Sequence, residues 1–159
     1  MTASTESAVE LIHFPGVRVA VLEHRGDPRN IPHSVQKFIA WRRRLGLVPA
    51  VIETYNVFVT APDVPPEQFQ MDLCASFEGV IEPDDPEIRM KSIPAGHCAR
   101  LRHVGDERGL HAAIHRLVTV WLPVSGQTPG RFPLFLQRVK FGMDVPPDDV
   151  VTDIFLPLA

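Results

Sequence analysis

The chain repeats one of its own segments about half a chain length later. The segment Asp63-Val64-Pro65-Pro66 recurs as Asp144-Val145-Pro146-Pro147, at an offset of 144 − 63 = 81 positions in a chain of 159 residues. Self-similarity at a fixed period constrains architecture more strongly than any local pattern. The sequence therefore predicts a duplicated half-domain with pseudo-twofold symmetry.

Two further matches support the duplication. His24 and His103 each precede an x-Gly-Asp sequence, at an offset of 103 − 24 = 79, and Trp41 and Trp121 lie 80 positions apart. The three matches occur in the same order in both halves. The drift in offset predicts one-residue insertions in turns, which loops tolerate.

Each half is expected to contain a strand, a helix and two further strands. Asn30 and Asp106 are suitable helix N-caps, and Gly46 and Gly126 suitable helix ends. The fold class predicted is α+β, a duplicated β-α-β-β module with an antiparallel-rich sheet and two helices on one face. Strands are expected over 17–24, 51–60, 70–77, 88–93, 97–104, 134–141 and 150–156, with Pro62 to Pro66 as a turn.

The predicted organisation is a flexible N-terminus over residues 1–14 and a single domain over 15–159. The two repeats are expected at about 15–82 and 87–158, joined by an acidic, proline-containing linker. No apolar run is long enough to cross a membrane and no signal peptide is evident, so a cytoplasmic protein is expected. Cys74 and Cys98 are then free thiols rather than a disulfide.

Charge and spacing exclude several functions. A net charge of −3 gives no reason to expect direct nucleic-acid binding. His111 and His115 have a spacing that can bind a metal, with Glu107 as a third ligand, but a polar pair on a helix flank is the favoured interpretation. No metal or cofactor is expected. His24 and His103, and likewise Asp72 and Asp153, are expected to have structural roles.

The order of these elements and their turn residues resembles a known family, the GyrI-like or effector-binding domain. This domain is shared by the bacterial gyrase inhibitory protein and by the effector domains of some transcription activators. The similarity covers about residues 15–158. It is carried by His24-Arg25-Gly26, Pro65-Pro66-Glu67, Met71-Asp72-Leu73, Val104-Gly105-Asp106, Trp121 to Gly126, Pro133-Leu134-Phe135 and Thr152 to Leu158.

The resemblance implies a pocket between the two halves, open on the sheet face away from the helices. Family members bind bulky, often cationic aromatic compounds through a glutamate in a Phe-Glu-x-Tyr segment. That segment aligns with Phe135-Leu136-Gln137-Arg138, so Leu136 stands at the glutamate position and Arg138 at the tyrosine position. The hydrolysis of reactive compounds by some relatives uses the same glutamate, so Leu136 argues against this activity here, although whether the chain is an enzyme stays open.

At an offset of 81, Leu136 corresponds to Tyr55. A pocket containing Tyr55, Leu136 and Arg138 would favour a neutral or anionic aromatic ligand. Glu53 is the best substitute for the missing carboxylate, and Trp41 and Trp121 either pack in the core or form a wall of the pocket. The alternative is that Arg138 reaches solvent while Tyr55 and Leu136 only pack the sheet.

The resulting prediction is a stand-alone small-molecule-binding protein. Two alternatives stay open, a protein that inhibits or modulates DNA gyrase and a hydrolase of reactive xenobiotics. A transcription regulator is a further candidate partner. Fold similarity cannot choose among these, because function depends on the site.

Overall fold

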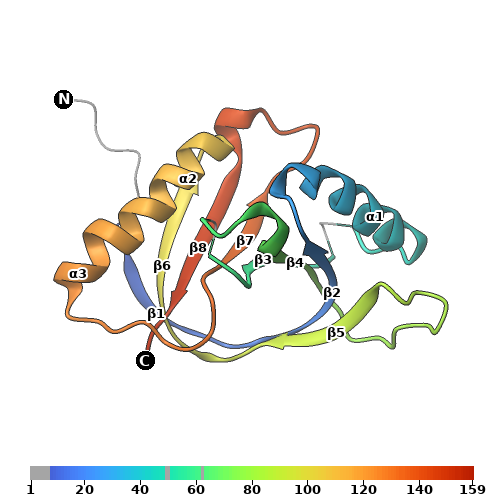
Figure 1. Ribbon diagram of the computed structural model, residues 1–159, viewed down its shortest axis with the longest axis horizontal. Helices are drawn as coiled ribbons and strands as arrows, with labels where there is room; N and C mark the ends of the chain where they lie inside the picture. Colours follow the sequence, from blue (N-terminus) through green and yellow to red (C-terminus); the bar gives the residue numbers. More distant parts are fainter. Residues whose placement is uncertain (1–7, 49–50, 62) are drawn as a thin grey trace. The chain divides into compact units, whose positions relative to one another are not determined.

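The computed structural model describes residues 8–48, 51–61 and 63–159. The chain forms two compact units, here called the first-half unit (Gly16–Pro94) and the second-half unit (Met1–Pro15 with Ala95–Ala159). Each unit contains four antiparallel strands and one long helical segment (Figure 1). The predicted α+β class and duplication are confirmed.

The first-half unit has the strand order β3-β4-β2-β5. All three pairings are antiparallel. Its elements are β2 (Val17–Arg25), α1 (Ile31–Arg44), β3 (Thr54–Phe58), β4 (Gln70–Ser76) and β5 (Ile88–Ile93).

The second-half unit has the strand order β1-β6-β8-β7, again all antiparallel. A 3-10 turn begins at the second residue of the Pro-Pro pair in each unit, at Pro66–Gln68 and Pro147–Asp149. The elements of this unit are β1 (Glu10–Phe14), β6 (Gly96–Val104), α2 (Glu107–Arg116), α3 (Leu122–Ser125), β7 (Phe135–Lys140) and β8 (Val151–Pro157).

The outermost strand of each sheet comes from the segment just before the other half. β1 leads directly into β2 but pairs with β6, and β5 leads directly into β6 but pairs with β2. The prediction of a flexible terminus over 1–14 is therefore wrong for residues 10–14, which form β1. Residues 1–7 and Pro62 of the predicted turn lie outside the described residues.

The helices begin and end where turn chemistry predicts. The Asp106 side chain accepts a hydrogen bond from the Gly109 N–H at 2.9 Å, a standard N-cap. After α2 the helix widens into a π-type turn, Leu117–Trp121, in which the Leu122 N–H bonds to the Leu117 carbonyl. Pro123 has no N–H to continue the ordinary ladder, which accounts for the wider turn. No helix among the described residues is long and apolar enough to span a bilayer.

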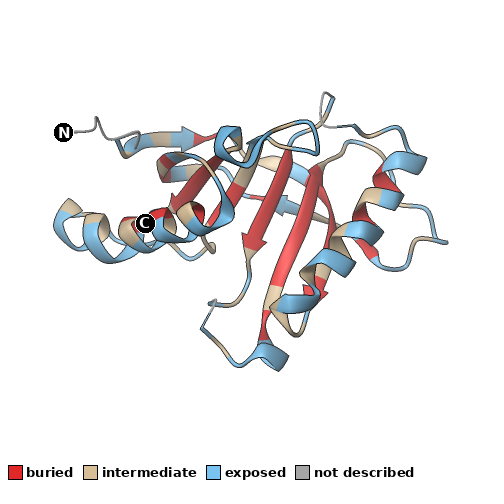
Figure 2. Cartoon of the chain, turned by 90° about the horizontal axis from the view of Figure 1, so that it is seen from above, coloured by how far each residue is buried: buried red, intermediate tan, exposed pale blue. Residues whose placement is uncertain are grey.

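α1 covers one face of the first-half sheet. Phe38 and Trp41 stack with ring centroids 5.8 Å apart, and Phe77 meets Trp41 edge-on at 5.6 Å. Burial follows the strands and the inner side of the helix, while the outer side is exposed (Figure 2). The buried cluster on this face consists of Ala20, Leu22, Phe38, Trp41, Phe69, Met71, Leu73, Ala75 and Ile88.

Candidate functional site

Strands β3 and β7 carry three of the six predicted site residues, Tyr55, Leu136 and Arg138, and the registers of the two strands differ by one residue. Tyr55 lies opposite Cys74 on β4, whereas Leu136 lies opposite Ile154 on β8. β8 follows β4 at an offset of 81, so the residue corresponding to Tyr55 is the one opposite Phe155. That residue is Phe135, at an offset of 80.

The extra residue is a β-bulge. The pairing of β7 with β8 shifts between Arg138 and Lys140, so that Val139 has no partner across the strand pair. The sequence predicted that such insertions lie in turns, and here the prediction is wrong. Bulges of this kind insert one residue into one strand of an antiparallel pair.

A one-residue change of register transfers a side chain to the other face of a sheet. The structural counterpart of Leu136 is consequently Asn56, not Tyr55. The prediction that Tyr55 occupies the position symmetric to Leu136 is wrong. Asn56 was missed because the offset of 81 from the Pro-Pro turns was applied to the part of the strand that precedes the inserted residue.

Leu136 and Arg138 lie on the side of their sheet that carries α2. Leu136 is 1% exposed. The Arg138 guanidinium donates to Glu107 at the start of α2, at 2.8 Å, and approaches the hydroxyl of Thr152 at 3.4 Å. The expectation that this position faces away from the helices is therefore wrong for the second-half unit.

The Arg138–Glu107 ion pair is only partly shielded from solvent. The Arg138 side chain is 19% exposed and that of Glu107 is 65% exposed. His111 lies 4.0 Å from the same glutamate. Among the described residues, no group of three or more His, Cys, Asp or Glu side chains could hold a metal ion.

Tyr55 and Glu53 interact with each other in the first-half unit. Tyr55 is buried in β3, and Glu53 is exposed just before that strand. Burial raises the pKa of the Tyr55 phenol, and the negative charge of the hydrogen-bonded Glu53 carboxylate raises that pKa further. The phenol therefore stays protonated and donates to the carboxylate.

The two tryptophans have different surroundings. Trp41 is 4% exposed and belongs to the core cluster beneath α1. Its indole N–H donates to a carboxylate oxygen of Asp85 at 3.2 Å. Trp121 is half-buried at the end of the π-type turn.

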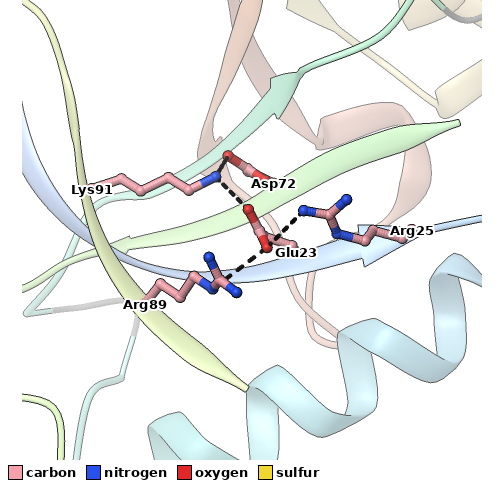
Figure 3. Close-up of polar contacts among 5 residues, drawn as sticks. All are labelled: Glu23, Arg25, Asp72, Arg89 and Lys91. Carbon is pink, nitrogen blue, oxygen red and sulfur yellow. Dashed lines mark hydrogen bonds and ion pairs between the residues drawn. The ribbon is translucent and has the colours of Figure 1, made fainter. Parts of the chain in front are cut away.

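A cluster of charged residues lies at the other face of the first-half sheet (Figure 3). Glu23 and Asp72 are opposite each other on β2 and β4, and the Lys91 ammonium binds both, at 2.7 and 2.8 Å. Arg25 and Arg89 approach the same glutamate from more exposed positions. The second oxygen of Asp72 is buried and has no hydrogen-bond partner within the described part of the chain.

The second-half unit has a simpler version of this cluster. Arg102 replaces the glutamate at the corresponding position of β6 and pairs directly with Asp153 opposite it, at 2.8 Å. The hydrogen bond to Asp153 raises the pKa of the Arg102 guanidinium. The predicted structural role of Asp72 and Asp153 thus takes the form of cross-strand ion pairs.

The repeated histidines bind the turns that lead into the helices. The His24 ring is buried and lies 2.7 Å from the Ser34 hydroxyl and 3.0 Å from the Asp27 carbonyl. His103 makes a similar contact to the Asp106 carbonyl at 3.1 Å. The structural role predicted for this pair is confirmed.

Comparison with known proteins shows the family to which the chain belongs. The sequence matches the family described as the GyrI-like small molecule binding domain over residues 7–159. The chain belongs to the GyrI-like family. A relative from Escherichia coli (strain K12), described as probable transcriptional regulator YgiV, is 32% identical over 155 residues, covering 95% of this chain and 96% of the relative.

Solved structures show the same fold at low sequence identity. The C-terminal domain of EcmrR matches with a TM-score of 0.72 and 14% identity, over 96% of this chain and 97% of that domain. In the EcmrR–DNA complex, 95% of this chain matches only 57% of the EcmrR chain. SAV2435 bound to tetraphenylphosphonium matches with a TM-score of 0.61 and 9% identity, over 96% of this chain and 94% of that protein. The sequence match therefore gives the family, and the solved structures show that the fold is shared.

Proposed function

We propose that this GyrI-like protein binds an aromatic molecule that is neutral or anionic, with Leu136 and Arg138 among the contacts. The observation that supports this most directly is that the position where the family resemblance expects a glutamate holds an apolar, packed residue, Leu136, and therefore no carboxylate for a cation. A buried leucine offers nothing to offset the desolvation of a cation. An aromatic body without positive charge fits this strand position better.

Arg138 gives the site its preference for negative charge. Its guanidinium is held by Glu107, whose side chain is 65% exposed. Ion pairs with an exposed partner contribute about 1 kcal/mol or less. A ligand carboxylate or sulfonate can replace Glu107 at low cost and bind the planar guanidinium through two hydrogen bonds.

The remaining predicted contacts, Trp41, Glu53, Tyr55 and Trp121, stay predictions. Asn56 joins them as the counterpart of Leu136. The probable regulator among the relatives supports a sensing role, in which ligand binding is linked to transcriptional control. No feature of the described residues favours gyrase inhibition or hydrolysis over this role.

Tetraphenylborate and tetraphenylphosphonium provide a test, because the two ions have nearly the same shape and opposite charge. We expect the wild-type protein to bind tetraphenylborate more tightly in isothermal titration calorimetry. Leu136→Glu should reverse that order, and Arg138→Gln should weaken the anion by about tenfold, because it removes the positive charge and the contact of the guanidinium with a phenyl ring. Tighter binding of the cation by the wild type, unchanged in both variants, would overturn the proposal.

A further inference from the structure

A groove of about 470 Å³ runs along α1 in the first-half unit. It lies between the helix and the segment 84–88 that leads into β5. Its volume falls within the range of small-molecule sites in proteins. The floor is apolar and consists of Leu22, Ala40, Trp41 and Ile88.

Asp85 ties the two walls of the groove together. One of its carboxylate oxygens accepts the indole N–H of Trp41 at 3.2 Å, and the other pairs with the guanidinium of Arg44. The Asp85 side chain is 13% exposed. The segment is therefore held against the helix, and the groove has a defined width at this point.

The other charged side chains along the edge of the groove, here called the rim, are held by weaker ion pairs or by none. Lys37 on α1 and Glu87 across the groove form an ion pair at 3.2 Å, with side chains 46% and 60% exposed. Exposed pairs of this kind contribute little and exchange readily. Asp84 lines the groove and has no ion pair or side-chain hydrogen bond within the described ranges.

The rim therefore carries more negative than positive charge. Three carboxylates (Asp84, Asp85, Glu87) and two cations (Lys37, Arg44) line it, a balance of −3 + 2 = −1. We propose that the groove is a second ligand site, which takes a primary monoamine with an apolar body. The ammonium donates to Asp84 and, in place of Lys37, to Glu87, while the apolar body covers Ala40 and Ile88.

The adjoining hollow limits the choice of amine. A space of about 180 Å³ continues from the groove past Lys37 and Glu87. Its other charged walls are Glu23, Arg25 and Arg89, so that with Lys37 and Glu87 the balance is −2 + 3 = +1. A second ammonium at the far end of a ligand would meet these guanidinium groups. A monoamine should therefore bind more tightly than a diamine of similar length. This site contains neither Leu136 nor Arg138, and Trp41 is the one residue it has in common with the contacts predicted for the first site.

Trp41 serves as the reporter for the test. Its indole N–H resonance, identified by its persistence in a Trp121→Phe variant, is followed by NMR as 4-phenylbutylammonium is added. We expect a saturable shift. The similarly sized 4-phenylbutyrate and 4-phenylbutanol should bind at least about tenfold more weakly, because the butyrate is repelled by the rim carboxylates and the neutral alcohol offers one O–H donor and no positive charge.

Variants connect the shift to the rim. Asp84→Asn with Glu87→Gln should weaken 4-phenylbutylammonium by about tenfold or more. Asp148→Asn with Asp149→Asn, in the second-half unit, is the matched control and should have no effect. Equal affinity for the amine and the alcohol, or unchanged affinity in the Asp84 and Glu87 variant, would refute the amine site. Leu136→Glu should leave this binding unchanged, so failure of the tetraphenylborate test and failure of this one are separable.

Discussion

The carboxylates of Glu23 and Asp72 stand directly opposite each other on neighbouring strands and are bound by one ammonium, that of Lys91. Like charges directly opposite in a sheet are destabilising. Lys91 therefore stabilises the pairing of β2 with β4 as well as its own strand. Because Lys91 comes from β5, the cluster connects three strands of the first-half sheet.

Replacing Lys91 by methionine should destabilise the protein by about 2–3 kcal/mol, because it leaves the buried Asp72 carboxylate without a cation and Glu23 with only the more exposed Arg25 and Arg89. This value is at the low end for buried pairs, since Lys91 is 34% exposed. Urea unfolding measures the change. Arg89→Met is the matched control on the same strand, and it should cost less than about 1 kcal/mol. Adding Glu23→Gln to Lys91→Met should recover part of the loss; no recovery would show that repulsion is not the cause.

The titration of Glu23 should reflect the same contact. The hydrogen bond from Lys91 holds the pKa of Glu23 below its ordinary value of 4.5. A lowered carboxyl pKa stabilises the fold above pH 4.5, and this contribution is lost as the pH falls through the folded-state pKa. Carbon-13 NMR of the side-chain carboxyl should give a midpoint below 4.5 in the wild type and a higher one in Lys91→Met. Identical midpoints would contradict the assignment.

Phe14 should anchor β1 to the second-half sheet. Its ring meets Phe135 and Phe155 edge-on, at 5.0 and 5.3 Å, and is 4% exposed. Phe14→Ala should therefore lower the free energy of unfolding by about 3–5 kcal/mol. Leu11→Ala on the same strand, at a side chain 50% exposed, should change it by less than about 0.5 kcal/mol. Similar values for both would mean that β1 does not contribute as a packed strand.

Deleting Val139 should be tolerated, because the equivalent pairing of β3 with β4 in the first-half unit has no bulge. Its side chain is 43% exposed, so little packing is lost, and we expect a change within about 1 kcal/mol. Deleting Gln137 instead should cost more, since closing the bulge then moves Arg138 to the position opposite Asp153, on the other face from Glu107, and Val139 to the position opposite Thr152. Thermal unfolding of the two deletions makes the comparison. Equal losses would argue against the bulge assignment.

The sequence predicted most of the elements, because the repeat, the caps and the alternation in strands are local signals. It also predicted the structural histidines from their recurrence. It did not predict the register of β7, since a one-residue bulge leaves no mark in composition. β1 was missed because its partner is distant, with Glu10 opposite Arg100, 100 − 10 = 90 positions away.

The groove beside α1 could not be predicted from the sequence either. Residues 82–86 were interpreted as a linker, and nothing local indicates that Asp85 pairs with both Trp41 and Arg44 on a helix some forty residues earlier. Arg138 shows the same limit. Its alternation with Leu136 was predictable, whereas its partner Glu107 depends on how α2 packs.

The crossed pairing of β1 and β5 means that neither half of the chain is a self-sufficient piece. A fragment cut after β4 would keep β1, which has no place in its own sheet, and lose β5, which does. The complementary fragment would keep β5, which has no place in its own sheet, and lose β1, which does. Two such fragments should associate, because each carries the strand that the other lacks. A single copy of the repeat should exchange its outer strand with a second copy, as in a domain-swapped dimer.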